Sequence, residues 1–274
     1  MPVDIDAAVL SNTRLSSNYN VVRLAAPEIA RQARPGQFIM VRPGRNGEPF
    51  LRRPFSVFEI LRDPSGSVVG LSLLNKQIGI ATRAIFALEP GDRLPCLGPL
   101  GQPFTPVDPP TETWMVAGGV GLAPFAMLAE SLRSRGSATT LFYGARHGVE
   151  LYYLDFFEQL GTRLVLTTED GSRGETGFVT SALENALRKL PPHAPLMVYA
   201  CGPTRMLAAV ARLAAAYSRP AEVSLEQVMG CGLGGCYSCV VEVRNGDRDG
   251  HYVRACIEGP VFRSDRVIWE TLMH

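Results

Sequence analysis

The chain has 274 residues, 46% of them hydrophobic and 19% charged, which is the composition of a compact globular protein with two or three small domains. Its formal net charge is +1, and Lys and Arg are scattered along the sequence, so nucleic acid is disfavoured as a partner. No basic segment precedes an apolar run at the N-terminus, and the most apolar window, residues 114–129, is shorter than the ~20 residues that span a bilayer, so we expect a cytoplasmic protein without a membrane partner.

Residues 1–107 carry the signals of antiparallel β structure. Short apolar runs such as QFIMV, PFSVFEI and SVVGLSLLN are separated by the turn clusters PG, RNGE, DPSG and EPGD. Turns this frequent favour a small barrel or sandwich, and we predict an antiparallel β-barrel. One helical stretch, IATRAIFAL, precedes the EPGD turn, and the proline-rich VDPPTET that follows indicates a linker.

Residues 108–225 alternate strand-like runs with amphipathic segments of helix length. TWMVAGG leads to APFAMLAESLRSRG, TTLFYGAR to ELYYLDFFEQLG, RLVLTTEDG to VTSALENALRKL, and LMVYACG to PTRMLAAVARLAAAY. Four such units in a row predict a doubly wound parallel α/β sheet with helices on both faces. Ligands of this architecture bind beyond the carboxyl ends of the strands.

The remaining residues, 226–274, form a small C-terminal module that is rich in cysteine. Its opening stretch GCGLGGCYSC supplies Cys231, Cys236 and Cys239, and a fourth cysteine, Cys256, follows after sixteen residues. Zinc ribbons use two closely paired sets of thiols, whereas one cluster of three plus a distant fourth is the spacing of plant-type [2Fe–2S] proteins. A hairpin with NG in its turn, VVEV–RNGDRDG–HYVRA, would return Cys256 to Cys239. Disulfides are disfavoured because nothing suggests export, and structural zinc stays an open alternative.

Three Gly-rich or polar turns follow strands of the predicted parallel sheet. AGGVGLAP, residues 117–124, joins the first strand to its helix, where glycines let the backbone approach a pyrophosphate. YACGP places Cys201 at the end of another strand, and TTEDGS follows a third. In the β-rich part, RRPFS offers a guanidinium and a hydroxyl that suit a diphosphate. Each signal alone is weak, and packing explains each almost as well.

Together these pieces resemble the ferredoxin-NADP reductase superfamily, in which a flavin-binding β-barrel precedes a nicotinamide-binding α/β domain. RPFS resembles its R-x-[YF]-[ST] flavin motif, GGVGLAP its nicotinamide pyrophosphate loop, and CGP its motif beside the nicotinamide ring. The ending SLEQVMGCGLGGCYSC with CIEGPVF is more specific. It resembles the electron-transfer subunits of type B dihydroorotate dehydrogenase, and the similarity covers essentially the whole chain.

The resemblance implies three domains and their site residues. The domains are an FAD-binding barrel (1–107), a nicotinamide-binding α/β domain (108–225) and a [2Fe–2S] module (226–274). The implied FAD residues are Arg53, Pro54, Phe55, Ser56, Leu74, Asn75, Lys76, Gly79, Ala81 and Thr82. The implied NAD residues are Gly118, Gly119, Gly121, Leu122, Ala123, Pro124, Cys201, Gly202 and Pro203. The implied cluster ligands are Cys231, Cys236, Cys239 and Cys256. The family usually has Tyr where Asn75 stands and Gly where Ala81 stands.

A chain with sites for nicotinamide, flavin and cluster converts hydride transfer into single-electron transfer. The resemblance implies an FMN-containing dihydroorotate dehydrogenase catalytic subunit as partner, in a heterotetramer that serves pyrimidine biosynthesis. The four histidines lie in turn-like or terminal contexts without a paired nucleophile, so we assign no catalytic residue and expect the organic substrate to bind the partner.

Two questions about ligands and partners stay open. The acidic pair Glu169 and Asp170 in TTEDGS would repel a 2′-phosphate and favours NAD over NADP, although Arg173 nearby argues the other way. The partner could instead be a hydrogenase, a ferredoxin-linked transhydrogenase or an oxygenase. A zinc-binding module on a reductase scaffold, without redox activity, is the alternative from a different class.

Overall fold

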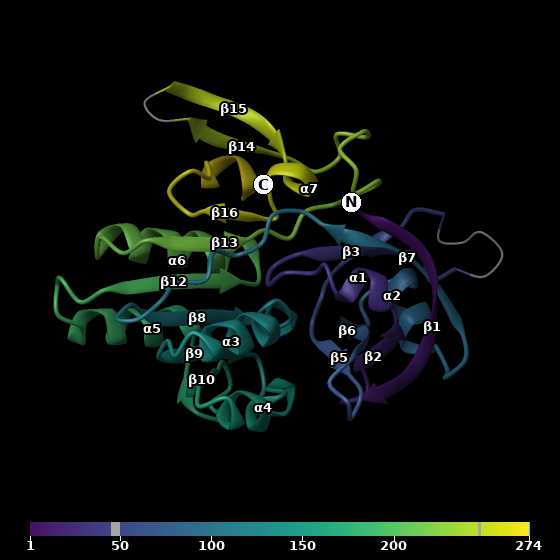
Figure 1. Cartoon of the computed structure of the whole chain (residues 1–274). Helices are drawn as coiled ribbons and strands as arrows, with labels where there is room; N and C mark the ends of the chain where they lie inside the picture. The colour runs from purple at the N-terminus through teal and green to yellow at the C-terminus, as the bar shows by residue number, and fades with distance from the viewer. Residues whose placement is uncertain (45–49, 246–247, 274) are drawn as a thin grey trace.

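The computed structural model describes residues 1–44, 50–245 and 248–273. The turn predicted at RNGE and the Gly246 position of the predicted NG turn lie outside these ranges. Figure 1 shows a β-barrel beside a parallel sheet, with the hairpin β14–β15 at the top of the view. The barrel part contains β1 (Val3–Arg14), β2 (Tyr19–Ala25), α1 (Pro27–Ala30), β3 (Phe38–Val41), β4 (Arg53–Ser56), β5 (Ile60–Arg62), β6 (Val68–Lys76), α2 (Ile80–Phe86) and β7 (Arg93–Leu100).

The strands of the barrel part form one antiparallel sheet in the order β4-β3-β7-β1-β2-β6-β5. The two outer strands, β4 and β5, are halves of one run, residues 53–62. Its first half pairs with β3, and its second half bonds to β6, where Phe58 N–H donates to the Ser72 carbonyl at 3.0 Å. The sheet therefore curls back on itself, which confirms the predicted antiparallel barrel.

The second sheet has the order β11-β10-β9-β8-β12-β13-β16 and is parallel except for β16, which runs antiparallel to β13. Its central strands β8 and β12 are buried on both faces, as expected for strands covered by helices on each side. Its parts are β8 (Glu112–Gly118), η1 (Gly119–Leu122), α3 (Phe125–Ser134), β9 (Thr139–Ala145), η2 (Gly148–Glu150), α4 (Leu154–Gln159), β10 (Arg163–Thr168), β11 (Glu175–Thr176), α5 (Val179–Lys189), β12 (Leu196–Cys201), α6 (Thr204–Ala216) and β13 (Ala221–Ser224).

Helices cover both faces of this sheet, which confirms the doubly wound prediction. Alternate residues of β8 point to opposite faces: Trp114 and Val116 pack with α5 and α6, whereas Met115 and Ala117 pack with α3 and α4. The four predicted strand-to-helix units correspond to β8–α3, β9–α4, β10–α5 and β12–α6. The carboxyl ends of these strands face the barrel, so the predicted glycine turns lie at the junction between the two sheets.

The C-terminal module is not separate from the parallel sheet. It consists of β14 (Val240–Asn245), β15 (Arg248–Arg254), α7 (Ala255–Glu258), β16 (Val261–Arg263) and η3 (Trp269–Leu272). The strand β16 joins the sheet beside β13, where Val223 lies opposite Phe262. We did not predict this strand, because VFR is too short to give a periodic signal. The apolar core is continuous here, since Met40 of the barrel, Val223 of the sheet and Val241 of the hairpin belong to one buried cluster. The domain boundaries at 107/108 and 225/226 stay predictions.

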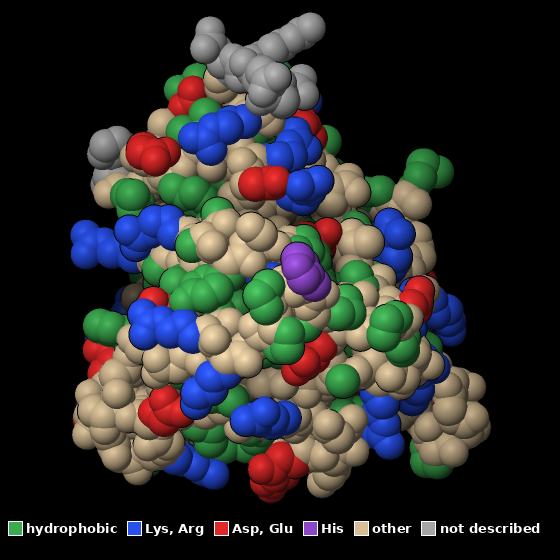
Figure 2. Space-filling model, turned by 90° about the vertical axis from the view of Figure 1, so that its left-hand side faces the viewer, with side chains coloured by type: hydrophobic (Ala, Val, Ile, Leu, Met, Phe, Trp, Pro, Cys, Tyr) green, Lys and Arg blue, Asp and Glu red, His purple; other side chains and the backbone are tan. Residues whose placement is uncertain are grey.

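The surface carries charges of both signs. Figure 2 shows one face, on which Lys and Arg side chains are interspersed with Asp and Glu side chains. Within the part of the chain that the structure describes, every helix is too short or too polar to cross a membrane.

Candidate functional site

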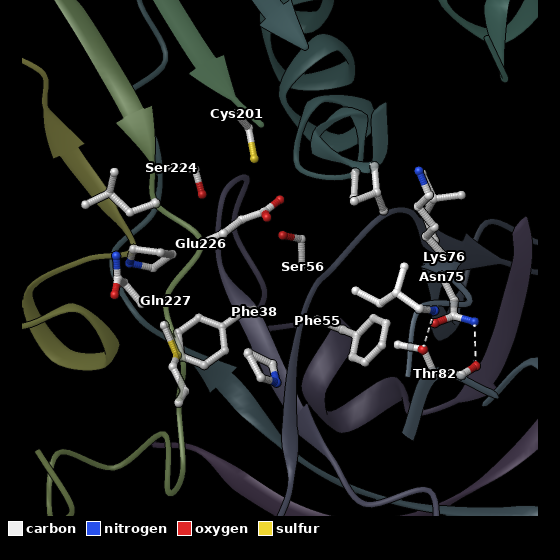
Figure 3. A pocket seen from close by; sticks show the side chains of 18 residues that line it. Phe38, Phe55, Ser56, Asn75, Lys76, Thr82, Cys201, Ser224, Glu226 and Gln227 are labelled. Carbon is white, nitrogen blue, oxygen red and sulfur yellow. Dashed lines mark hydrogen bonds between the residues drawn. The ribbon is translucent and has the colours of Figure 1, made fainter. Parts of the chain in front are cut away.

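A cavity of about 270 Å³ lies where the barrel, the parallel sheet and the start of the C-terminal module meet. Figure 3 shows side chains from all three parts around it. The predicted site residues in its lining are Pro54, Phe55, Ser56, Leu74, Asn75, Lys76, Thr82, Ala123 and Cys201. Its other lining residues are Phe38, Ile78, Val120, Ser224, Leu225, Glu226, Gln227, Met229 and Pro260. Seven of the ten residues assigned to FAD therefore line this cavity together with two of the nine assigned to NAD, Ala123 and Cys201.

The RPFS segment forms strand β4 and pairs with β3, with Ser56 opposite Phe38. Its first residue, Arg53, differs from the other three because it does not line the cavity. The guanidinium of Arg53 donates to the backbone carbonyls of Leu51 (3.0 Å) and Arg52 (3.1 Å). The side chain is only half-buried, so it is free to reach a phosphate at the rim. Its contact with FAD stays a prediction.

The second predicted flavin stretch ends β6 and begins α2. The Thr82 hydroxyl oxygen accepts hydrogen bonds from the backbone N–H groups of Ile78 (2.8 Å) and Gly79 (2.9 Å), which closes the turn between the two elements. A side chain at Gly79 would meet no atom within 4 Å, so the space beside this backbone is open. The methyl group of Ala81 is 7% exposed. It packs into the protein, so this departure from the family pattern does not narrow the open space at Gly79.

The predicted nicotinamide loop packs tightly against the end of β12. A Cβ atom at Gly121 would lie 2.3 Å from the carbonyl oxygen of Cys201, and one at Gly118 would lie 2.7 Å from the sulfur of Met206. Packing against rigid backbone therefore requires a glycine at Gly121, whereas the Met206 side chain that a Cβ atom at Gly118 would meet is flexible. Gly119 is different, because it has φ +55° and its nearest neighbour would be the hydroxyl of Tyr19 at 3.7 Å. Gly119 is the glycine of this loop that leaves room for a ligand.

The remaining predicted nicotinamide residues belong to the end of the glycine loop and to the CGP motif. Leu122 and Ala123 are buried at 0% and 5% exposure, and Pro124 precedes α3. Gly202 has φ +151°, and a Cβ atom there would lie 3.1 Å from the backbone nitrogen of Gly118. The CGP motif, which Pro203 ends, and the glycine loop thus contact each other directly across β8 and β12.

The sequence reasoning missed Glu226, which lines the cavity together with Cys201. In Figure 3 its carboxylate points toward the hydroxyl of Ser56, with Cys201 and Ser224 on the same side of the cavity. Part of the Glu226 side chain is exposed to solvent. Protein atoms around its carboxyl group nevertheless remove much of the surrounding water, and this desolvation raises its pKa. Burial also raises the pKa of the Cys201 thiol, and the charge of Glu226 adds to this effect. An acidic residue two positions after the strand Ala221–Ser224 was the available signal.

The TTEDGS turn after β10 is held by a local network. The carboxylate of Asp170 accepts hydrogen bonds from the backbone N–H (3.0 Å) and hydroxyl (2.6 Å) of Ser172, and it lies 2.9 Å from Nδ1 of His147. The Ser172 contacts and, next, His147 hold the pKa of Asp170 well below its usual range. The side chain of Glu169 is exposed and has no hydrogen bond or ion pair among the described residues. It is therefore the carboxylate that is free to meet a ribose.

The cysteine loop, residues 230–239, lies against the barrel. A Cβ atom at Gly232, whose φ is +72°, would lie 2.5 Å from the Cγ atom of Met40 in β3. The Sγ atom of Cys231 accepts a hydrogen bond from the backbone N–H of Leu233 at 3.3 Å. The hydrogen-bonded hydroxyl of Ser238 and, after it, the thiol of Cys231 lower the pKa of Cys236 to about 6. The loop is thus arranged to favour sulfur in its thiolate form.

The hairpin β14–β15 returns Cys256 to Cys239, as predicted. Val240 lies opposite Arg254, and the Ala255 N–H donates to the carbonyl of Cys239 at 2.9 Å. Burial raises the pKa of Cys256 to about 12, and contact with the Cys239 thiol adds to the shift. The guanidinium of Arg254 ties the returning strand to the loop through the Gly234 carbonyl at 3.0 Å.

The Cys231 thiol affects the pKa of Cys236, and the thiols of Cys239 and, more weakly, of Cys231 affect the pKa of Cys256, so the four cysteines lie in one neighbourhood. In residues 1–44, 50–245 and 248–273, no three His, Cys, Asp or Glu side chains converge on one metal-ion position. Zinc requires four ligands around a single point, whereas the two irons of a [2Fe–2S] cluster share four cysteines. Four cysteines in one neighbourhood supply the ligand set that a [2Fe–2S] cluster requires.

Comparison with known proteins identifies the family. The chain is 38% identical to the protein "Dihydroorotate dehydrogenase B (NAD(+)), electron transfer subunit" of Desulforamulus reducens, over 97% of this chain and 98% of that protein. It is 33% identical to the protein of the same name, called a homolog, of Aquifex aeolicus, over 98% and 100% of the two chains. The chain belongs to the family of dihydroorotate dehydrogenase B electron transfer subunits. Two family models match parts of it: the oxidoreductase NAD-binding domain over residues 115–212, and the iron-sulfur cluster binding domain of dihydroorotate dehydrogenase B over residues 226–268.

Solved structures support the same fold for this dihydroorotate dehydrogenase B family member. One chain of an NADH-dependent reduced ferredoxin-NADP oxidoreductase, described in connection with flavin-based electron bifurcation, matches with a TM-score of 0.84 at 28% identity. The match covers 97% of this chain and 91% of that chain. A ferredoxin NADP+ reductase from Neisseria gonorrhoeae with bound FAD and NADP matches with a TM-score of 0.63 at 20% identity, over 78% of this chain and 91% of that one. The second likeness concerns the fold alone.

Proposed function

We propose that this chain carries FAD, NAD and a [2Fe–2S] cluster and passes electrons between NAD(H) and an FMN-containing dihydroorotate dehydrogenase catalytic subunit. One observation carries the proposal. The cavity is lined by the flavin stretches of the barrel, by Val120, Ala123 and Cys201 of the nicotinamide motifs, and by the segment 224–229 that leads directly to Cys231. The flavin and nicotinamide stretches therefore line one cavity, and the chain that continues from its lining carries the first of the cluster cysteines.

The barrel side of this cavity is the proposed flavin site. Pro54, Phe55 and Ser56 offer a flat apolar surface with one hydroxyl, which suits an aromatic ring system with polar edges. The open backbone at Gly79 and the half-buried guanidinium of Arg53 suit the diphosphate of FAD. When bound, the flavin exchanges a hydride with nicotinamide and single electrons with an iron-sulfur cluster.

The sheet side is the proposed nicotinamide site. Gly119 leaves the space through which a diphosphate can approach the backbone between β8 and α3. Cys201, Ser224 and Glu226 then surround the position where the ring would meet the flavin side of the cavity. Burial raises the pKa of Glu226, so its carboxyl group keeps a proton to a higher pH than an ordinary carboxyl group does.

The cysteine loop is the proposed exit for electrons. Cys236 is exposed, and exposed apolar side chains lie around it: Val228, Leu233, Tyr237 and Ile257. Such a surface fits contact with another protein better than contact with water. We propose that the partner subunit docks here and that two copies of each chain form a heterotetramer in the cytoplasm.

Purification of the full chain under anaerobic conditions tests the cofactor part of the proposal. The protein should contain one FAD and about two iron and two sulfide per chain, as this cluster type requires. Cys256→Ser should lose the iron, whereas Cys96→Ser is a matched control, because Cys96 is equally buried but lies in the barrel. Stoichiometric zinc without acid-labile sulfide would contradict the cluster assignment.

Addition of the partner tests the electron-transfer part. The chain alone should reduce artificial acceptors with NADH and should not oxidise dihydroorotate. Adding an FMN-containing dihydroorotate dehydrogenase catalytic subunit should form a stable complex and restore NAD-linked oxidation of dihydroorotate. Oxidation of dihydroorotate by the chain alone would contradict the need for a partner.

A second candidate function rests on the structural likeness to the NADH-dependent reduced ferredoxin-NADP oxidoreductase. In that case the chain would serve a ferredoxin-linked transhydrogenase. The same experiment separates the two functions, because this alternative predicts electron exchange with ferredoxin and no complex with the dihydroorotate dehydrogenase subunit.

A further inference from the structure

Three asparagine amides form a buried chain of hydrogen bonds behind the barrel side of the cavity. Asn12 lies on β1, Asn20 on β2 and Asn75 on β6, and Asn20 stands directly opposite Asn75 in the sheet. The Nδ2 group of Asn20 donates to Oδ1 of Asn12 at 2.7 Å, and the Nδ2 group of Asn75 donates to Oδ1 of Asn20 at 2.7 Å. Asn20 and Asn75 are both 0% exposed.

The direction of this chain is determined at both ends by backbone carbonyls, which can only accept. The Nδ2 group of Asn12 donates to the carbonyl oxygens of Leu88 (2.7 Å) and Phe86 (3.1 Å) just beyond α2. The Nδ2 group of Asn75 also donates to the carbonyl of Thr82 at 3.0 Å, as Figure 3 shows. Turning any of the three amides over would place an oxygen against another oxygen. The amide oxygen of Asn75 is therefore the end of the chain.

That oxygen has no partner. Oδ1 of Asn75 is buried and makes no hydrogen bond with the described residues, although Asn75 lines the cavity. A buried acceptor without a donor costs about 1–3 kcal/mol, so native proteins rarely keep one unless a ligand or an ordered water completes it. The neighbouring side chain in the lining, Ile78, is 78% exposed and has space in which to move aside.

We propose that Asn75 is a flavin-positioning residue whose Oδ1 atom accepts a hydrogen bond from the bound flavin, either from its ring imide N–H or from a ribityl hydroxyl. The proposal rests on the proposed function, because it requires FAD in this cavity. It also gives a physical reason for the departure from the family pattern at this position. An asparagine held by the Asn20 amide and by the Thr82 carbonyl supplies a fixed acceptor where the family usually has a tyrosine hydroxyl.

The test strips flavin from the full chain and measures reloading with FAD by fluorescence. Asn75→Leu keeps the volume and removes the acceptor, and it should weaken FAD binding about fivefold to tenfold, the usual worth of one such hydrogen bond. Ser72→Ala is the matched control. Ser72 is buried on the same strand as Asn75, its hydroxyl donates a hydrogen bond to Glu59, and it does not line the cavity. This variant should bind FAD as the wild type does.

Flavin analogues identify the donor. FAD methylated at the imide nitrogen, or FAD lacking one ribityl hydroxyl, should bind the wild-type chain more weakly than FAD. The analogue that lacks the donor should bind the Asn75→Leu variant as well as FAD does. Equal FAD affinity of the wild type and Asn75→Leu would overturn the inference and point to an ordered water, while a wild-type chain that takes up no flavin would overturn the proposed function as well.

A measurement on the unaltered chain covers the case in which the variant does not fold. The ¹³Cγ resonance of Asn75 should move when FAD or riboflavin is added, and it should not move when ADP-ribose is added. A resonance that does not respond to flavin would overturn the inference.

Discussion

Gly121→Ala should damage both the stability of the chain and its nicotinamide site. The added Cβ atom would lie 2.3 Å from the carbonyl oxygen of Cys201 and 2.7 Å from the Cα atom of Gly202. An ordinary contact begins at 3.4 Å, so the loop would have to move by about 1 Å. The atoms in the way are backbone atoms of β12, which is bonded to β8 and β13 on its two sides, so they cannot give way cheaply.

The cost follows from the usual range for overpacking, about 1–3 kcal/mol, and rigid backbone on one side favours the upper end. At about 3 kcal/mol, the midpoint of thermal unfolding should fall by about 6–12 °C for a chain of this size. A displacement of the loop by about 1 Å should also raise the KM for NADH by tenfold or more.

Thermal unfolding followed by circular dichroism and NADH-dependent reduction of an artificial acceptor measure the two effects. Gly79→Ala is the control for stability, because its Cβ atom meets nothing within 4 Å and its φ of −159° is extended. The control should keep the wild-type midpoint. A Gly121→Ala variant with a wild-type midpoint and a wild-type KM would refute the claim that this glycine is required by packing against β12.

Three further predictions concern single charged residues. Arg53→Ala should weaken FAD binding about tenfold or more, because a charge-assisted contact to phosphate is lost, and full FAD occupancy after dilution would contradict the assignment. Glu226→Gln should raise the midpoint of thermal unfolding at neutral pH, because burial raises the folded-state pKa of Glu226 and so penalises its charged form. The gain should shrink as the pH falls through that folded-state pKa and vanish below the unfolded value of about 4.3, and a gain that persists at low pH would contradict this cause. Glu169→Arg should increase the ratio of NADPH to NADH activity about tenfold, because a repulsive contact with the 2′-phosphate is replaced by an attractive one, and a wild-type chain that already prefers NADPH would contradict the choice of NAD.

Local periodicity predicted most of the fold. The strand and helix pairs of the parallel sheet were readable because each strand is a continuous apolar run followed by an amphipathic helix, as in LMVYACG before α6. The barrel was readable from its frequent turns. The strand β16 was not, because three residues carry no periodicity, and its pairing with β13 depends on the chain returning through the hairpin and α7.

The residues of the candidate site that belong to sequence motifs were predictable. The residues that reach the site only through contacts between separate strands were not. The cysteine spacing and the glycine turns mark their positions in the sequence. Glu226 lies in the quoted SLEQVMG stretch, but that stretch gave it no role, and its place in the cavity arises only when the end of β13 meets β4 and β12. The packing reason for Gly121 was also hidden, since its tight contact with the end of β12 is a property of the folded sheet. The asparagine chain joins three strands and could not be read from any one of them.

The pairing of β16 with β13 has a consequence for protein engineering. A truncated chain that ends before Val261 would leave the backbone groups of β13, from Glu222 to Ser224, without their partners and would create an open sheet edge of the kind that promotes self-association. Transplanting the cysteine loop onto another reductase is difficult for the same reason. The transplanted segment would include β16, which needs a sheet whose outer strand is free to pair with it. The proposed electron exit of this chain is thus built into the scaffold that holds its predicted nicotinamide loop and cannot be exchanged like a tethered appendage.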